Sequence, residues 1–202
     1  MGKPASERIV SLDLDLPIWD RFFLISPLAV IGTREPGGGY DLAPKHLVTP
    51  LGWENYFGFV CTPRHATYRN AERERAFTVS FPRPDQVVLA SLMATPRCDD
   101  ETKPTLLALP TVSATAVDGV FLEDAYVRLE CELHRVIDGF GSSGLIAGRI
   151  VAAHVPEEAL RLEDEDPQDL LTRCPLLAYL PPGRYACIDR SFAFPLPAGI
   201  RI

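Results

Sequence analysis

The sequence predicts a mainly β fold, with one closed β-barrel carrying helical insertions over residues 1–202. Short runs of β-branched and apolar residues recur along the chain, whereas helical spacing is confined to a few short segments. Hydrophobic residues make up 47% and charged residues 23% of the chain, which is the composition of a globular protein with a buried core. No linker or internal repeat divides the chain, so these runs are expected to form a single domain.

The first two strands are predicted on either side of a glycine-rich break. Residues 17–23 are typical of a short helical turn, because proline favours an early helical position. Residues 26–33 are apolar and β-branched and predict a buried strand, and residues 40–43 resume an extended pattern. The triple glycine at 37–39 fits a tight hairpin that requires positive φ, because the phosphate-binding patterns GxxxxGK[ST] and GxGxxG are absent.

The other elements follow from the same periodicities. Further strands are predicted over residues 55–61, 76–81, 112–117, 126–136 and 145–155, with helices over 63–75 and 85–93. Polar, glycine-rich or proline-rich stretches predict an exposed loop over 95–110 and a turn over 138–144. An acidic, helix-prone segment (156–174) and a short closing segment (175–187) follow. We therefore expect a barrel core over about residues 20–155 and a helical and extended extension over 156–202.

Composition disfavours several classes of function. The net charge of −7 opposes non-specific binding to nucleic acid. No apolar run reaches the roughly 18 residues of a membrane helix, and the first residues lack the apolar stretch of a signal peptide. Five cysteines without a CxxC pair and four histidines without ligand spacing predict reduced thiols, no metal and a cytoplasmic protein. No GxSxG turn indicates a nucleophile, and no catalytic residue is predicted.

Two segments concentrate groups that suit a flat ring and a phosphate. Residues 41–46 (DLAPKH) end a strand at a proline, which leaves backbone donors and acceptors available to a heterocycle with imide edges. Residues 64–70 (RHATYRN) bring Arg64, Thr67 and Asn70 into one turn, where a spacing of three puts Thr67 and Asn70 on the same face. Such groups suit a phosphate. A helix cap with ordinary surface charge explains the same residue types equally well.

Five short motifs follow one another in a particular order and spacing. They are PLAVIGTR at 27–34, DLAPK at 41–45, Thr67-x-x-Asn70, FTVS at 77–80 and LEC at 129–131. Each motif is weak alone, but together they resemble the flavin reductase-like family, in its flavoredoxin branch, over roughly residues 20–155. The resemblance implies an FMN-binding split β-barrel that is usually a homodimer.

The resemblance also implies roles for seven residues. Along the isoalloxazine ring and the ribityl chain would lie Ala43, Pro44, Lys45 and His46. The phosphate would be held by Arg64, Thr67 and Asn70. The implied activity is that of an NAD(P)H-dependent flavin reductase, with FMN as cofactor and NADH or NADPH as co-substrate. Hydride passes directly between two rings in such a reaction, so it needs no protein acid or base. The sequence does not identify the final electron acceptor, for which free flavin, a ferric chelate, a monooxygenase partner protein and a small organic substrate all stay open.

Four departures from the family pattern keep other functions open. Asp41 replaces the usual Asn, His46 the usual Ser, and Ser80 the usual Asn. The turn at 141–144 reads GSSG where many members have Gly-Asp-His, whose histidine lies near the flavin or the nicotinamide. The alternatives are an FMN-binding electron-transfer protein that does not use nicotinamide directly, and a β-barrel binding module without flavin.

A homodimer is expected on geometric grounds as well. A split barrel leaves sheet edges and apolar faces that an identical subunit can cover. The aromatic residues Trp53, Tyr56, Phe57 and Phe59 could belong to such an interface, to a ring pocket or to the core.

Overall fold

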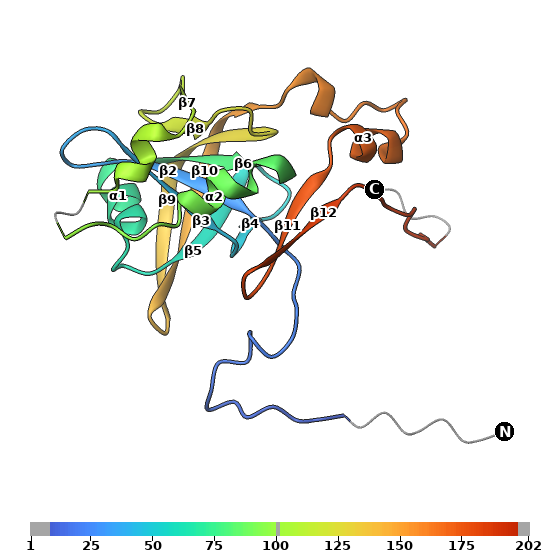
Figure 1. Cartoon of the computed structure of the whole chain (residues 1–202), viewed down its shortest axis with the longest axis horizontal. Helices are drawn as coiled ribbons and strands as arrows, with labels where there is room; N and C mark the ends of the chain where they lie inside the picture. The colour runs from blue at the N-terminus through green and yellow to red at the C-terminus, as the bar shows by residue number, and fades with distance from the viewer. Residues whose placement is uncertain (1–8, 100–101, 198–202) are drawn as a thin grey trace.

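The computed structural model describes residues 9–99 and 102–197. Its main feature is a curled antiparallel sheet of seven strands in the order β3-β2-β6-β9-β10-β5-β4 (Figure 1). The strands are β2 (Ala29–Arg34), β3 (Tyr40–Lys45), β4 (Val48–Pro50), β5 (Tyr56–Cys61), β6 (Ala76–Phe81), β9 (Val127–Phe140) and β10 (Ser143–His154). The mainly β prediction is confirmed. The ladder ends at β3 and β4, so the barrel is split, as the family resemblance implies, and is not the closed barrel that the periodicities predict.

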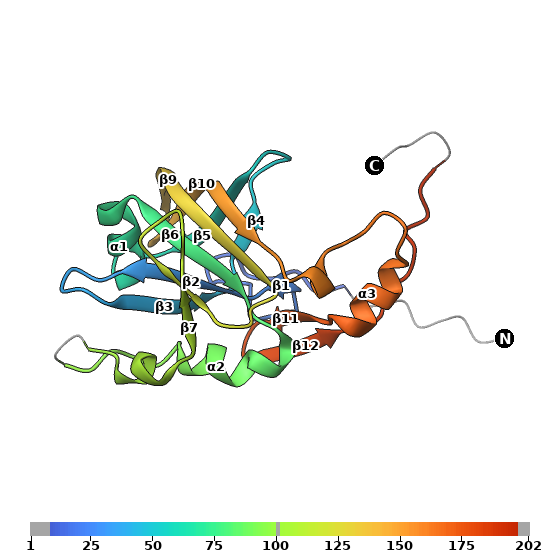
Figure 2. The same ribbon diagram turned by 90° about the horizontal axis from the view of Figure 1, so that it is seen from above.

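Smaller elements surround this sheet. Two further sheets consist of β1 (Ser26–Pro27) with β11 (Leu176–Leu180) and β12 (Arg184–Ile188), and of β7 (Thr111–Ser113) with β8 (Val120–Leu122). The α-helices are α1 (Ala66–Glu74), α2 (Val87–Leu92) and α3 (Pro167–Arg173). Three 3-10 turns are η1 (Pro84–Gln86), η2 (Pro104–Ala108) and η3 (Glu157–Ala159). Figure 2 shows α2 and the β11–β12 hairpin near β3.

The core consists of two clusters, one on each face of the curled sheet. Phe59 and Phe77 meet edge to face in the first cluster, with ring centroids 5.1 Å apart. The second cluster joins Val30 and Leu122 of the strands to Met93 after α2. Because Phe59 and its neighbour Phe57 are 0% and 2% exposed, these two aromatics belong to the core, whereas Trp53 is fully exposed.

Most of the predicted elements are present, and the differences have local causes. The glycine-rich break is a hairpin turn, with positive φ at Gly38 and Gly39, as predicted. The strand predicted over 112–117 is present only as the three-residue β7, and the three-residue strands β4 and β8 were not predicted. Residues 17–23 form a single turn and no helix. In this turn the Arg21 N–H donates to the Ile18 carbonyl at 3.0 Å.

The segments predicted as loops and extension carry more structure than expected. The exposed loop predicted over 95–110 contains η2, and Leu109 within it is 8% exposed. The acidic segment 156–174 is helical only over η3 and α3. The closing segment 175–187 forms the β11–β12 hairpin, and β11 pairs with β1, so the extension returns to the start of the barrel. The single-domain organisation stays a prediction, and the first eight residues, where no signal peptide is expected, lie outside the described residues.

A buried carboxylate fixes the β7–β8 connection to the sheet. Glu130 on β9 is 0% exposed and accepts hydrogen bonds at 2.8–3.1 Å from the backbone and hydroxyl of Thr115. Its other donors are Ala116 N–H, Val117 N–H and His154 Nε2. Burial alone raises the pKa of Glu130, but the hydrogen bonds, led by that of the Thr115 backbone, outweigh it and lower the pKa to about 2. The ionised carboxylate therefore stabilises the fold.

Replacing Glu130 with Gln is expected to lower the free energy of unfolding at neutral pH by roughly 3 kcal/mol. A depressed carboxyl pKa gives stability that is complete above the ordinary value of 4.5 and is lost as pH falls toward about 2. The wild-type protein should thus lose stability through this window, and Glu130→Gln should lose much less. Urea unfolding across pH measures both. The control is Glu132→Gln, whose exposed pair with Arg149 contributes below about 1 kcal/mol.

Candidate functional site

Two cavities meet where the end of β3 lies beside the segment that follows α2. We call the first the cationic pocket, about 340 Å³ in volume, and the second the apolar pocket, about 590 Å³. Pro44 and Ala94 line both pockets, so the two form one elongated cleft. Both volumes are in the range of small-molecule sites, which is about 300–1,000 Å³.

The predicted ring-binding segment lies along this cleft. Ala43, Pro44 and Lys45 line the cationic pocket, and His46 lines the apolar pocket together with Pro44. Ala43, Pro44 and Lys45 belong to β3, which is an edge strand of the sheet. An edge strand accommodates a proline, because its open side has no neighbouring strand to which an N–H group would donate. Edge strands also leave backbone groups unpaired on that side.

The cationic pocket receives the beginning of α1. Arg64, Ala66 and Thr67 line it, and the N-cap His65 makes no side-chain capping hydrogen bond. The first N–H groups of a helix have no intrahelical partner, and the helix dipole places partial positive charge there. Such a terminus is suited to an anion.

The side chains around the start of α1 add positive charge to that of the helix N-terminus. Lys45, Arg64 and Arg69 line the cationic pocket, and in the part of the chain that the structure describes none of them forms an ion pair with a carboxylate. The pKa of His65 is lowered by burial and by the nearby cations Lys45 and Arg69. In a chain of net charge −7, this local concentration of cations is suited to an anion.

Asp41 is the acidic residue in the lining of the cationic pocket, and it is 3% exposed. Its Oδ2 accepts a hydrogen bond from Thr67 Oγ1 at 3.1 Å, and its Oδ1 lies 3.1 Å from Arg97 Nη2 and 3.7 Å from Lys103 Nζ. Lys103 also donates to the carbonyls of Leu42 and Met93. Burial lowers the pKa of Lys103, and Asp41 opposes this shift. The carboxylate therefore balances cations that belong to the wall of the pocket.

Two of the predicted phosphate ligands are engaged within the protein. Thr67 lines the cationic pocket, but its hydroxyl donates to Asp41. Asn70 is 2% exposed, donates from Nδ2 to Thr33 Oγ1 at 3.2 Å and accepts from Arg73 Nη1 at 2.9 Å. It lines a third cavity behind the cationic pocket. Of the three predicted phosphate ligands, Arg64 keeps its charged group unpaired in the described structure.

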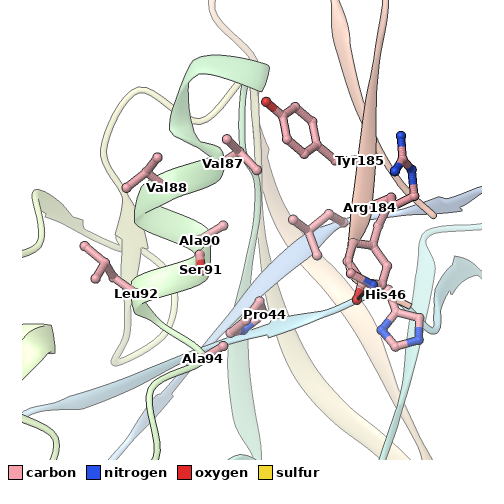
Figure 3. A pocket seen from close by; sticks show the side chains of 13 residues that line it. Pro44, His46, Val87, Val88, Ala90, Ser91, Leu92, Ala94, Arg184 and Tyr185 are labelled. Atoms are coloured by element: carbon pink, nitrogen blue, oxygen red, sulfur yellow. Dashed lines mark hydrogen bonds between the residues drawn. The ribbon is translucent and has the colours of Figure 1, made fainter. Parts of the chain in front are cut away.

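The apolar pocket lies between α2 and the β11–β12 hairpin, as Figure 3 shows. Val87, Val88 and Leu92 form the helical wall, and Tyr185 faces it from β12. Tyr179 is a second aromatic residue of this lining, and the centroids of the His46 and Tyr179 rings are 5.0 Å apart. Burial, and then the charge of Lys45, lowers the pKa of His46, which favours the neutral form of the ring.

Sequence reasoning missed several residues of this cleft. Arg97 and Lys103 come from the predicted exposed loop, and Tyr179 and Tyr185 come from the C-terminal extension. A proline-rich stretch that retains two isolated basic residues is a weak signal, and only the fold brings these residues to the cleft. In the described residues no group of three metal-binding side chains occurs, and no described helix is long and apolar enough to cross a membrane.

Fold and cleft together define a class of protein: a split barrel with an elongated cleft that is cationic at one end and apolar at the other. A family model described as the flavin reductase like domain matches residues 21–179, which is more than half of the chain. The chain therefore belongs to the flavin reductase-like family, and the resemblance inferred from its motifs is confirmed.

Solved structures share this fold over nearly the whole chain. Nitrilotriacetate monooxygenase component B from Bacillus cereus is 19% identical, covers 94% of this chain and 100% of its own, and has a TM-score of 0.79. Flavoredoxin from Methanosarcina acetivorans is 16% identical over 95% and 97% of the two chains, with a TM-score of 0.76. An FMN-binding protein from Thermus thermophilus with bound p-hydroxybenzaldehyde is 26% identical over 92% and 99%, with a TM-score of 0.73. No curated protein matches the sequence.

Proposed function

We propose that this protein binds FMN in the cleft and works as an NAD(P)H-dependent flavin reductase. The observation that carries the proposal is the order of the two pockets. A cluster of unpaired cations at a helix N-terminus leads directly into a larger apolar pocket. FMN has the same order of groups, with a phosphate at one end and a flat ring system at the other.

The residues present fit this ligand. Arg64, Arg69 and Lys45 supply charge for the phosphate, and the free N–H groups at the start of α1 add directed donors. Ala43 and Pro44 would line the ribityl chain and the near edge of the ring, since they lie between the two pockets. His46, whose lowered pKa favours the uncharged ring, and Tyr179 would border the flavin ring.

Bound FMN supplies the redox chemistry, because its ring accepts a hydride from a nicotinamide. The chain's own contribution is to hold the phosphate, orient the ring and exclude water from the apolar pocket. No acid or base is needed for this transfer, which agrees with the absence of a predicted catalytic residue. The name of the FMN-binding protein from Thermus thermophilus, at 26% identity, supports FMN as the cofactor.

Removing a phosphate-binding cation should weaken FMN binding selectively. For Arg64→Gln we expect the FMN dissociation constant to rise about tenfold, which corresponds to about 1.4 kcal/mol for one charge-assisted contact. Riboflavin lacks the phosphate, so its dissociation constant should change less than about twofold. Quenching of flavin fluorescence measures both ligands. The control is Arg161→Gln, an exposed site outside both pockets. Equal losses for FMN and riboflavin would contradict the assignment of Arg64 to the phosphate.

The nicotinamide reaction is tested separately on FMN-loaded protein under argon. Addition of NADH or NADPH should bleach the oxidised flavin absorbance, and turnover should require added flavin or another acceptor. The measurement is a stopped-flow absorbance trace with each nucleotide. A flavin that stays oxidised with both would exclude the reductase activity, although FMN binding would stand.

One structural feature favours the alternative, an FMN-binding electron-transfer protein. The turn between β9 and β10 consists of Gly141 and Ser142 and has no histidine. The nearby Asp138 accepts hydrogen bonds from Tyr68 Oη at 2.9 and 3.1 Å, so it braces the hairpin against α1. Under this alternative, reduced partner protein bleaches the bound flavin in the same argon experiment and both nucleotides fail.

We further propose that the working form is a homodimer. The segment before β1 runs away from the barrel in Figure 1 and exposes large apolar side chains, and Trp53 is exposed as well. In this segment they are Ile9, Val10, Leu14, Leu16, Trp19, Phe22, Phe23, Leu24 and Ile25, each at least 40% exposed. Such a row costs free energy in water and is suited to an apolar partner surface. Light scattering at micromolar concentration should give twice the chain mass of 22.3 kDa, and a monomer would refute the dimer.

A further inference from the structure

The segment that precedes the barrel contains the sequence pattern of a strand. Over residues 10–16, which we call the arm strand, valine or leucine at even positions alternates with serine or aspartate at odd positions. A period of two is that of a strand with one buried face. In the structure these residues belong to no helix or strand, and Leu14 and Leu16 are 80% and 63% exposed. The arm strand therefore has neither the neighbouring strand nor the apolar surface that its pattern requires.

An unpaired strand fits an open sheet edge, and β12 offers one. In the described structure β12 pairs only with β11, so its other side is open. With five residues it is the longest edge strand without a proline, because β3 and β4 contain Pro44 and Pro50 and the other edge strands have two or three residues. Free N–H and C=O groups along such an edge can bind an added strand.

The two faces of the β11–β12 hairpin differ in polarity. Tyr185 and Cys187 of β12 share one face with Tyr179 and Leu177 of β11, and Leu177 is 7% exposed. The opposite face of β12 carries Arg184, which forms no ion pair with a carboxylate of the described residues. A strand added to β12 should therefore present apolar side chains on the first face and acidic side chains on the second.

One antiparallel alignment of the arm strand meets both requirements. It pairs residues 13–16 with residues 185–188 in reverse order. The two leucines of the arm strand then lie on the face of Tyr185, and its two aspartates lie on the face of Arg184. Asp15 is diagonal to Arg184, a position from which long side chains make contact. A shift by one residue would turn the aspartates to the apolar face, so the alignment is well specified.

We propose that the arm strand of one copy adds to the β12 edge of a second copy, so that two subunits exchange arms. This inference rests on the proposed homodimer and specifies how its subunits bind. The arm leads into β1, which lies on the opposite side of β11 from β12. In Figure 1 it leaves the barrel and does not cross that small sheet, which favours a second copy over the same chain. Reciprocal exchange closes a dimer and leaves neither arm unpaired.

The exchange involves segments beyond the shared domain and still reaches the cleft. The arm strand and β12 both lie outside residues 21–179, the range that the family model matches. Tyr185 lines the apolar pocket, and Leu16 of the partner subunit would lie directly opposite it. The arm would therefore cover the outer rim of that pocket with an apolar side chain.

Disulfide trapping tests the alignment on the full chain. Leu14→Cys places a thiol opposite the exposed Cys187. Opposite residues of antiparallel strands have Cα atoms about 4.5–5.5 Å apart, which a disulfide spans. After mild oxidation with diamide, most of this variant should run as a covalent dimer on a non-reducing gel, and peptide mass spectrometry should find the linkage between positions 14 and 187. The matched control, Asp15→Cys, turns its thiol to the other face and should give at least about fivefold less of it.

The dissociation constant of the dimer gives a second measurement without new thiols. Asp15→Arg places like charges side by side at two contacts per dimer and should raise this constant about fivefold by analytical ultracentrifugation. Combining it with Arg184→Asp restores opposite charges and should bring the constant back to within about twofold of the wild type. The control is Asp20→Arg, an exposed position of the same segment outside the arm strand.

The outcomes distinguish the arm exchange from the homodimer. A wild-type protein that stays monomeric overturns both. A dimer that forms no linkage between positions 14 and 187, and whose dissociation constant does not respond to Asp15→Arg, refutes the exchange while the homodimer stands. A disulfide between positions 14 and 187 within one chain shows that the arm pairs with its own β12, which also overturns the exchange.

Discussion

One buried carboxylate, that of Asp41, holds together the three segments that form the cationic end of the cleft. It belongs to β3, accepts the Thr67 hydroxyl of α1, and pairs with Arg97 and Lys103 of the connection after α2. Without Asp41, Lys103 would be a buried cation without a carboxylate partner among the described residues, which costs several kcal/mol, whereas Arg97 would keep its pair with Glu35. The shape of the pocket and the position of its charges follow from this cluster.

An acid in an anion site is at first sight unfavourable. Asp41, however, is already shared between Arg97, Lys103 and a hydroxyl, so little of its negative field remains for a ligand. Lys45, Arg64 and Arg69 stay without carboxylate partners among the described residues and supply the net positive potential. The departure of Asp41 from the usual Asn is therefore compatible with phosphate binding, because the structure brings two compensating cations.

Local patterns in the sequence were enough to predict several strands, one helix and one hairpin of the fold. Strand β6, helix α1 and the β2–β3 hairpin were predicted within a few residues, because apolar periodicity and glycine act locally. Ala43, Pro44 and Lys45 line the cationic pocket, and their role along a flavin stays a prediction. Arg97 and Tyr185 could not be predicted, since tertiary packing alone brings them to the cleft. That Thr67 donates to Asp41 depends on a contact 26 residues away in sequence.

The two ends of the cleft also determine which way round a ligand can bind. A phosphate placed between α2 and Tyr185 would lose its hydration against apolar walls, which is costly for a charged group. In the cationic pocket the same group meets Arg64 and the start of α1, which replace its water. A flat ring buries apolar area beside Val88 and Leu92 in the apolar pocket. The phosphate is favoured in the cationic pocket and the ring in the apolar pocket, so both contributions to the binding free energy favour the same orientation. Polarity alone therefore orients a ligand that carries a ring and a phosphate across Pro44, before any specific ring contact forms.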